Sequence, residues 1–338
     1  MESSQNQDNN YQAQSKMSFF VISLILINHF LSGNAESSNR SISVCEHNLT
    51  YFLSKEGISP PEKGSGNYEK PSQTILTHLK SSIFFAINGN WPKSIPHALL
   101  SDYKVCLLKG DPNIAIWVPS KKKDGEATII LRLKNYNPLV LEFPHPFFDG
   151  VLSQAQILFN KTRAFALIVS GTHRCASKQP TKCTGKTRVC TGEKDKYPVS
   201  DVAHNEENSF HAAHLAISQN FLEGVVVSIH GTGREIAYIS DGSKGFGERN
   251  NLVSKVANNL SKIFPKTEIR SCDLSGPSTK GWLCGTGNVQ GRHINGSKDA
   301  CLLKAENTNG KFLHIEQPKE LRDNPIFLGE VLRDAIGR

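Results

Sequence analysis

The sequence predicts an α/β fold of three layers, with helices on both faces of a mixed, largely parallel central sheet, plus an N-terminal appendage. From residue 138 onward, short apolar runs alternate with segments that have the period of amphipathic helices. The chain has 338 residues, 38% of them hydrophobic, which is enough for one large core. We therefore expect a leader over residues 1–35, an N-terminal region of unknown role over 36–124 and a catalytic domain over 125–338.

The first 35 residues have the organisation of an export signal. Residues 1–16 are polar, and the apolar segment 18–31 is short for a membrane span. Gly33 and Ala35 are the small residues expected before a signal-peptide cleavage site. We expect a secreted protein; a membrane anchor formed by residues 18–31 is the alternative.

The elements before residue 135 are a helix and two strands. Residues 71–87 have an amphipathic helical pattern, and residues 113–119 and 126–134 have the composition of strands. The pair Asp124 and Gly125 between the two strands predicts a hairpin turn.

The remaining elements alternate between strands and helices. The expected strands are 138–143, 164–171, 224–231, 234–240, 267–274 and 311–317; the expected helices are 150–162, 206–222, 248–264 and a final one near Pro325. The glycine-rich stretch 276–296 is expected to be a long loop, and such loops are often functional.

Eight cysteines and five glycosylation sequons favour an oxidising compartment. Short loops favour a disulfide between Cys272 and Cys284, and another between two of Cys175, Cys183 and Cys190. Those three cysteines could instead ligate zinc, although they lack a C-x-x-C pair. The sequons are at Asn39, Asn48, Asn160, Asn259 and Asn295.

The formal net charge of +8 favours an anionic partner. Lysines and arginines are scattered, apart from the run at residues 121–123, and no aromatic residues interleave them. Nucleic acid is therefore not expected as a partner. We expect a small or peptide-like anionic substrate.

Two predicted strands end near histidines, and this pattern predicts a metal site. His145 follows the strand 138–143, His230 closes the strand 224–231, and an open sheet binds its ligands at the carboxyl ends of its strands. Asp149 comes four residues after His145 and could reach the same ion. Two imidazoles and a carboxylate are typical of catalytic zinc. For His145, a solvent-facing histidine at a strand end is the alternative.

Glu316 lies near the end of another predicted strand and is the candidate catalytic residue. A carboxylate in that position could take a proton from a zinc-activated water molecule. No G-x-S-x-G or H-E-x-x-H motif occurs, and the G-x-G at residues 285–287 opens no βαβ unit. These absences exclude a serine hydrolase of that type, a zincin and a dinucleotide-binding protein.

Three further residues are candidates for substrate binding. His173 and Arg174 follow the strand 164–171, so they should lie at the same edge of the sheet. Arg174 and Arg292 could bind a substrate carboxylate through the guanidinium fork. For Arg174, an ion pair with Asp201 is the alternative.

His211 and His214 are three residues apart on a predicted helix and could form a second metal pair. The alternative is that they hydrogen-bond within a packed interface, as helix histidines more often do.

Four stretches carry a resemblance to a known family: FPHPFFDG at 143–150, HNEENSFHAAHLAI at 204–217, VVVSIHG at 225–231 and KFLHIEQPKELR at 311–322. Over residues 138–336, the chain resembles the zinc amidohydrolase group of N-formylglutamate amidohydrolase and poly-gamma-glutamate hydrolase, and more distantly carboxypeptidase A. The resemblance implies a carboxypeptidase-like zinc hydrolase fold. It also implies Zn²⁺ bound by His145, Asp149 and His230, with Glu316 as the catalytic glutamate and Arg322 matching an arginine that follows it.

The sequence-based hypothesis is thus a secreted zinc-dependent hydrolase of amide bonds in a carboxylate-bearing substrate of N-acyl amino acid, gamma-glutamyl or peptide type. The alternative is a secreted, disulfide-bonded binding or surface protein that kept the scaffold without turnover. Glu316 favours the enzyme, because a binding protein has no need of a carboxylate facing the metal.

Overall fold

The structure is a computed structural model, and it describes residues 42–120, 125–221, 223–244, 251–272 and 281–337. The residues from Ile42 onward form one compact unit. The leader and the segment 18–31 lie outside the described residues. In the part of the chain that is described, no helix combines the length and apolar character that a bilayer crossing requires.

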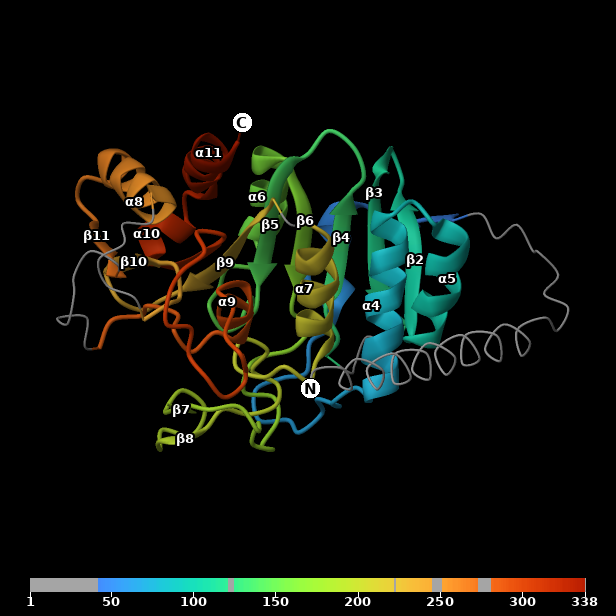
Figure 1. Cartoon of the computed structure of the whole chain (residues 1–338), viewed down its shortest axis with the longest axis horizontal. Helices are drawn as coiled ribbons and strands as arrows, with labels where there is room; N and C mark the ends of the chain where they lie inside the picture. The colour runs from blue at the N-terminus through green and yellow to red at the C-terminus, as the bar shows by residue number, and fades with distance from the viewer. Residues whose placement is uncertain (1–41, 121–124, 222, 245–250, 273–280, 338) are drawn as a thin grey trace, which may run out of the picture. The chain divides into compact units, whose positions relative to one another are not determined.

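The described residues contain one ten-stranded sheet (Figure 1). Across the sheet the strands are β1 (Ser43–Val44), β2 (Tyr103–Leu108), β3 (Asp111–Pro119), β4 (Thr128–Arg132), β6 (Ala164–Val169), β5 (Asn137–Phe143), β9 (Val225–Gly231), β12 (Phe312–Gln317), β10 (Ile236–Ser240) and β11 (Glu268–Ser271).

The centre of this sheet is parallel. β5 pairs in parallel with β6 and β9, and β9 pairs in parallel with β12. The flanking strands β4 and β10 run antiparallel to β6 and β12. Every residue of β6 is buried, because helices cover both faces of a parallel sheet. The predicted three-layer α/β/α fold with a mixed, largely parallel sheet is therefore confirmed.

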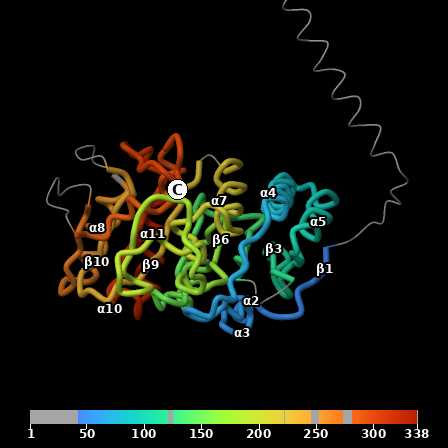
Figure 2. The backbone as a smooth tube through the Cα atoms, turned by 90° about the horizontal axis from the view of Figure 1, so that it is seen from below, coloured from blue at the N-terminus to red at the C-terminus, as the bar shows by residue number. Residues whose placement is uncertain are grey.

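Successive side chains of a strand point to opposite faces, so the sheet has two apolar cores. In β5, Leu139, Leu141 and Phe143 belong to one core and Val140 to the other. Figure 2 shows α4 and α5 on one side of β3, with α2 and α3 on the other.

Each core is closed by its own helices. The first core includes residues of α2 (Leu49–Phe52), α3 (Lys55–Ile58), α6 (Gln154–Thr162), α8 (Asn251–Ile263), α10 (Lys319–Arg322) and α11 (Pro325–Ile336). The second includes residues of α4 (Gln73–Ile87), α5 (Trp91–Leu100) and α7 (Ser209–Asn220), and Ile294 of α9 (Val289–Ile294) packs against it.

The described part of the N-terminal region, residues 42–120, contributes strands to the same sheet. β3 pairs with β4 in the expected antiparallel hairpin, although Asp124 lies outside the described residues. β2 and β1 extend the same sheet. The expected boundary at 124–125 therefore falls inside one compact unit. Apolar side chains of β2 and β3 are buried in the second core, together with side chains of the central strands β5 and β9.

The stretch expected as a long loop contains a short helix. α9 begins after Asn288, whose side chain accepts a hydrogen bond from the amide of Gly291 at 2.9 Å. An N-cap of this kind stabilises a helix start that the surrounding glycines conceal in the sequence.

All eight cysteines are paired, in the bonds Cys45–Cys106, Cys175–Cys190, Cys183–Cys301 and Cys272–Cys284. The expected Cys272–Cys284 bond and a bond within the group of Cys175, Cys183 and Cys190 are confirmed. No thiol of that group is left to bind a metal. Between Cys183 and Tyr197 the chain forms a two-stranded hairpin, β7 (Lys186–Thr187) with β8 (Asp195–Lys196).

Removing a disulfide should lower the free energy of unfolding, and more so for a longer loop. Cys45→Ser with Cys106→Ser opens a bond of sequence separation 61, and Cys272→Ser with Cys284→Ser opens one of separation 12. Chain entropy predicts losses of about 4 and about 3 kcal/mol. Urea unfolding of both double variants measures them; no loss in either would contradict the pairing.

Candidate metal centre and pocket

The candidate site lies where three neighbouring parallel strands end together. His145 follows β5 by two residues, while His230 and Glu316 are the penultimate residues of β9 and β12. The register places Glu316 directly beside His230. This pairing brings residues far apart in the sequence to one edge of the sheet, as expected for strand-end ligands.

His145, Asp149 and His230 form a buried trio. Asp149 Oδ2 is 3.1 Å from Nδ1 of His230 and 3.7 Å from Nδ1 of His145. The three side chains are at most 5% exposed. One ligand atom of each lies within 4.8 Å of the others. The structure therefore brings together the three residues that the sequence suggested as zinc ligands.

The donor atoms of this trio fit a metal ion. Nδ1 of His145 is buried without a hydrogen-bond partner, although a buried imidazole nitrogen normally has one. Nε2 of His145 is 2.8 Å from Asp201, and Nε2 of His230 is 3.0 Å from Ser228 Oγ. Metal-binding histidines use one nitrogen for the ion and hold the other in such a hydrogen bond. Two imidazoles with a carboxylate suit zinc.

The turn that carries Asp149 is held from behind by β9 and α10. The Asp149 amide donates to the carbonyl of His145 at 2.9 Å, and Arg322 Nη1 donates to the carbonyl of Asp149 at 2.6 Å. A Cβ at Gly231 would lie 2.3 Å from that carbonyl, so only glycine permits the approach. The position of the carboxylate thus depends on close backbone packing.

Asp201 fixes the orientation of His145. It is fully buried and accepts hydrogen bonds from His145 and His204, both at 2.8 Å, and from Arg174 at 2.6 and 3.0 Å. Burial would raise the pKa of Asp201, but the charges of Arg174, His204 and His145 hold it well below its usual value. Asp201 is therefore an ionised carboxylate, which keeps the proton of His145 on Nε2.

Asp149 is ionised for a similar reason. Burial raises its pKa, but the neighbouring imidazoles of His145 and His230, at 3.7 and 3.1 Å, lower it more strongly. Burial lowers the pKa of His230, which favours its neutral form. An ionised carboxylate and a neutral imidazole are the forms that bind a metal.

Glu316 faces the same space in the company of His314, which the sequence analysis missed. Oε1 of Glu316 is 3.6 Å from Nε2 of His314, and the His314 ring lies 4.6 Å from that of His230. Burial raises the pKa of Glu316 well above its usual value, and the charge of Asp149 adds to this shift. The period-two alternation of a strand would have revealed His314, since it shares a face with Glu316.

Two other trios of possible ligands overlap the first. His230, His314 and Glu316 form one and His145, Asp201 and His204 the other. In the second, hydrogen bonds from Arg174 and the two histidines already occupy both oxygens of Asp201. Among the described residues, the trio with Asp201 is therefore the least suited to an ion, and the other two trios share His230.

A pocket of about 580 Å³ opens above these groups. His145, His230, His314 and Glu316 form its floor. Its cationic lining residues are Arg174, Lys244 and Lys304, and its large aromatic ones are Tyr197 and Trp282. Burial and the charges of Arg292 and Lys244 lower the pKa of Lys304. The pocket is therefore suited to an anionic ligand with some apolar surface.

The candidate substrate residues lie in three different settings. Arg174 lines the pocket and forms the ion pair with Asp201 that was the alternative. His173 is half-buried, accepts a hydrogen bond from the amide of Cys175 at 3.1 Å, and packs edge-on against Phe148. Arg292 does not fit its expected role, because it is only 2% exposed and donates to three main-chain carbonyls.

His211 and His214 hydrogen-bond within the protein, as the alternative predicted. His214 lies between Glu142 at 2.7 Å and His293 at 3.2 Å, and His211 is 3.3 Å from Gln290. None of the metal-type trios among the described residues includes either histidine.

No family model matches the chain, and neither does any curated protein. Among solved structures, the zinc-free apo form of YNDL is 12% identical with a TM-score of 0.35, covering 62% of this chain and 89% of its own. A gene product from Agrobacterium tumefaciens is 14% identical with a TM-score of 0.36, covering 60% and 88%. A metallo-carboxypeptidase from Pseudomonas aeruginosa is 14% identical with a TM-score of 0.31, covering 63% and 59%. These similarities are too low to support a function, which we infer from the chain's own residues.

Zinc binding should distinguish the two trios that share His230. His145→Ala removes one of three ligands of the first trio, so zinc binding should weaken by more than about 100-fold. His314→Ala, the matched control, should retain zinc. Calorimetric titration of zinc into the metal-free variants measures both; tight binding by His145→Ala together with loss in His314→Ala would assign the metal to the other trio.

Asp201→Asn should weaken zinc binding without removing a ligand. The amide nitrogen that replaces one carboxylate oxygen cannot accept a hydrogen bond from Nε2 of His145, so the His145 ring loses its fixed tautomer. Such supporting residues typically contribute about 10–100-fold in metal affinity. The same titration measures the change, and a zinc affinity equal to that of the unmodified chain would contradict the role of Asp201.

Proposed function

We propose that this chain is a zinc-dependent hydrolase of amide bonds in a carboxylate-bearing substrate, of N-acyl amino acid, gamma-glutamyl or peptide type. The observation that carries the proposal is the unpartnered Nδ1 of His145, which shares a buried space with Asp149 and His230. Glu316 lies beside His230 at the floor of a pocket. A metal-binding trio and an adjacent carboxylate are the groups that amide hydrolysis needs.

The protein's own groups have distinct roles in this proposal. His145, Asp149 and His230 would hold a zinc ion, which when bound would supply a Lewis acid and acidify a water molecule. Glu316 would accept a proton from the attacking water and return it to the leaving amine. Burial raises the pKa of Glu316, so this carboxyl holds a proton more readily than an ordinary glutamate, as the return of the proton requires.

The substrate carboxylate is bound by the cationic side of the pocket. Arg174 uses Nε and Nη2 on Asp201, which leaves its Nη1 donors for a substrate oxygen. Lys244 and Lys304 line the same pocket, and Lys244 also pairs with Glu306 at its exposed rim. Charge attraction in a confined site favours an anion over a neutral analogue.

We also propose that the chain is exported. Four disulfides are typical of proteins that fold in oxidising compartments. The apolar segment 18–31 is the candidate signal.

Glu316→Gln should separate catalysis from metal binding. Gln keeps the size of the side chain but cannot accept the proton, so turnover should fall about a hundredfold to ten-thousandfold. Zinc content should remain near one per chain. Hydrolysis of a panel of N-acyl amino acids, gamma-glutamyl peptides and carboxyl-terminal dipeptides measures turnover, and elemental analysis measures zinc.

The matched control is Glu330→Gln, which changes a half-exposed carboxylate of α11 that pairs with Lys161 of α6. This variant should leave turnover and zinc content unchanged. Full turnover in Glu316→Gln would refute the catalytic role. A chain that binds no zinc and hydrolyses none of the panel would support the binding-protein alternative.

A further inference from the structure

Three of the segments that line the pocket are far apart in the sequence, and we call them walls. The hairpin wall, residues 184–197, contributes Thr187, Val189 and Tyr197 to the lining. The glycine wall is residues 282–288, and the lysine wall, residues 300–304, contributes Lys304. Figure 1 shows the hairpin of β7 and β8 beyond the carboxyl end of β5, where the floor of the pocket lies.

These walls have little regular structure of their own. The hairpin wall contains only the two-residue strands β7 and β8, and the other two walls contain no helix or strand. The floor differs, because His230, His314 and Glu316 belong to strands of the central sheet. Cross-links or side-chain contacts, rather than backbone hydrogen bonds of helices and strands, must therefore hold the walls at a fixed spacing.

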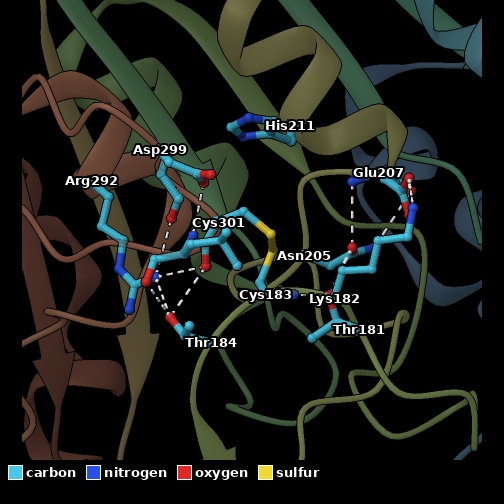
Figure 3. Close-up of a disulfide and its surroundings, with 12 residues drawn as sticks. Thr181, Lys182, Cys183, Thr184, Asn205, Glu207, His211, Arg292, Asp299 and Cys301 are labelled. Carbon is cyan, nitrogen blue, oxygen red and sulfur yellow. Dashed lines mark hydrogen bonds and ion pairs between the residues drawn. A yellow bond between two sulfur atoms is a disulfide. The ribbon is translucent and has the colours of Figure 1, made fainter.

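A disulfide joins Cys183, the residue before the hairpin wall, to Cys301 in the lysine wall (Figure 3). Cys183 and Cys301 lie 118 residues apart in the sequence and are at most 4% exposed. Beside them, the amide of Thr184 donates to the carbonyl of Cys301 at 2.9 Å, and its hydroxyl lies 3.0 Å from the carbonyl of Leu302. The two walls thus meet in a covalently closed corner.

Arg292 connects the third wall to this corner. Its Nε donates to the carbonyl of Thr286 in the glycine wall at 3.0 Å. Its Nη1 donates to the carbonyls of Ala300 and Cys301 and to the hydroxyl of Thr184, at 3.1 to 3.2 Å. One buried guanidinium therefore contacts all three walls.

The chemistry of Arg292 argues for a structural task. Its guanidinium donates to neutral carbonyl and hydroxyl oxygens, and it is not among the residues that line the pocket. Burial lowers its pKa, because the charged form loses hydration. Such a cost is offset where one arginine donates several hydrogen bonds at once.

We propose that Arg292 and the Cys183–Cys301 disulfide act as a corner clamp that fixes the spacing of the three walls and so determines how tightly the part of the ligand distant from the metal is bound. Arg292 is a positioning residue in this proposal. The identity of the ligand rests on the proposed function, whereas the fixed spacing of the walls does not. Preorganised walls favour binding because the loops lose less freedom when the ligand enters.

Amide hydrogen exchange tests the clamp without a ligand. In Cys183→Ser with Cys301→Ser, peptides covering the three walls should exchange at least about tenfold faster, as their local opening becomes easier. Peptides covering β9 should not change. The matched control is Cys45→Ser with Cys106→Ser, which removes a bond between the residue after β1 and strand β2 and should leave wall exchange unaltered. Unchanged exchange in the first variant would overturn the clamp.

Two zinc-binding probes test the effect on binding. Acetohydroxamate is small enough to need only the floor, whereas adipate monohydroxamate extends a carboxylate towards the walls. In the zinc-loaded full-length chain, loss of Cys183–Cys301 should weaken the longer probe about tenfold or more and leave the shorter one within about twofold. Equal weakening of both probes, or of neither, would contradict the proposal.

Arg292→Lys provides a second variant that keeps the charge and the disulfide. Lysine cannot reproduce a fork that reaches three walls, so wall exchange and binding of the longer probe should change as in the disulfide variant. Wild-type behaviour in Arg292→Lys would remove the arginine from the clamp. If the unmodified chain binds neither hydroxamate but its walls loosen in the variants, the clamp stands and the proposed function fails.

Discussion

The parallel pairing of β5, β9 and β12 is the constraint on which the site depends. Parallel strands in register end at the same edge of the sheet. His145, His230 and Glu316 therefore lie together, although His145 and Glu316 are 171 residues apart in the sequence (316 − 145). Apolar side chains on both faces of these strands hold the register, because a slip of one residue would exchange the two cores. The stability of the core and the geometry of the site thus have the same origin.

The buried carboxylate of Asp201 determines the protonation of His145. Asp201 is stable as an anion because Arg174 and two histidines surround it, and it determines which nitrogen of His145 carries a proton. Asp149 is ionised by its two histidine neighbours, whereas Glu316 has a raised pKa through burial and the charge of Asp149. Two carboxylates on one site therefore differ in proton affinity, as proton transfer beside a metal requires.

The sequence predicted the layers, most central strands and the grouping of His145, Asp149 and His230, because a strand that stops at a polar side chain leaves a visible pattern. It did not reveal Asp201 as the partner of His145, since a loop carboxylate has no periodicity that names its neighbour. Arg292 was misassigned because sequence shows a charge but not the carbonyls that surround it. Cys183–Cys301 was unforeseen because proximity in sequence is a poor guide to a bond across 118 residues.

The floor of the pocket lies on strands, whereas its walls are cross-linked loops. This difference affects how the sequence of such a protein can change in evolution. Substitutions, insertions or deletions within residues 184–197 or 282–288 alter segments that contribute no member of the candidate metal-binding trio. Natural variation can therefore alter ligand preference while the reactive groups are inherited intact. The cysteines that tie the loops extend this freedom, because a covalent anchor tolerates changes of loop sequence that a packed interface would not.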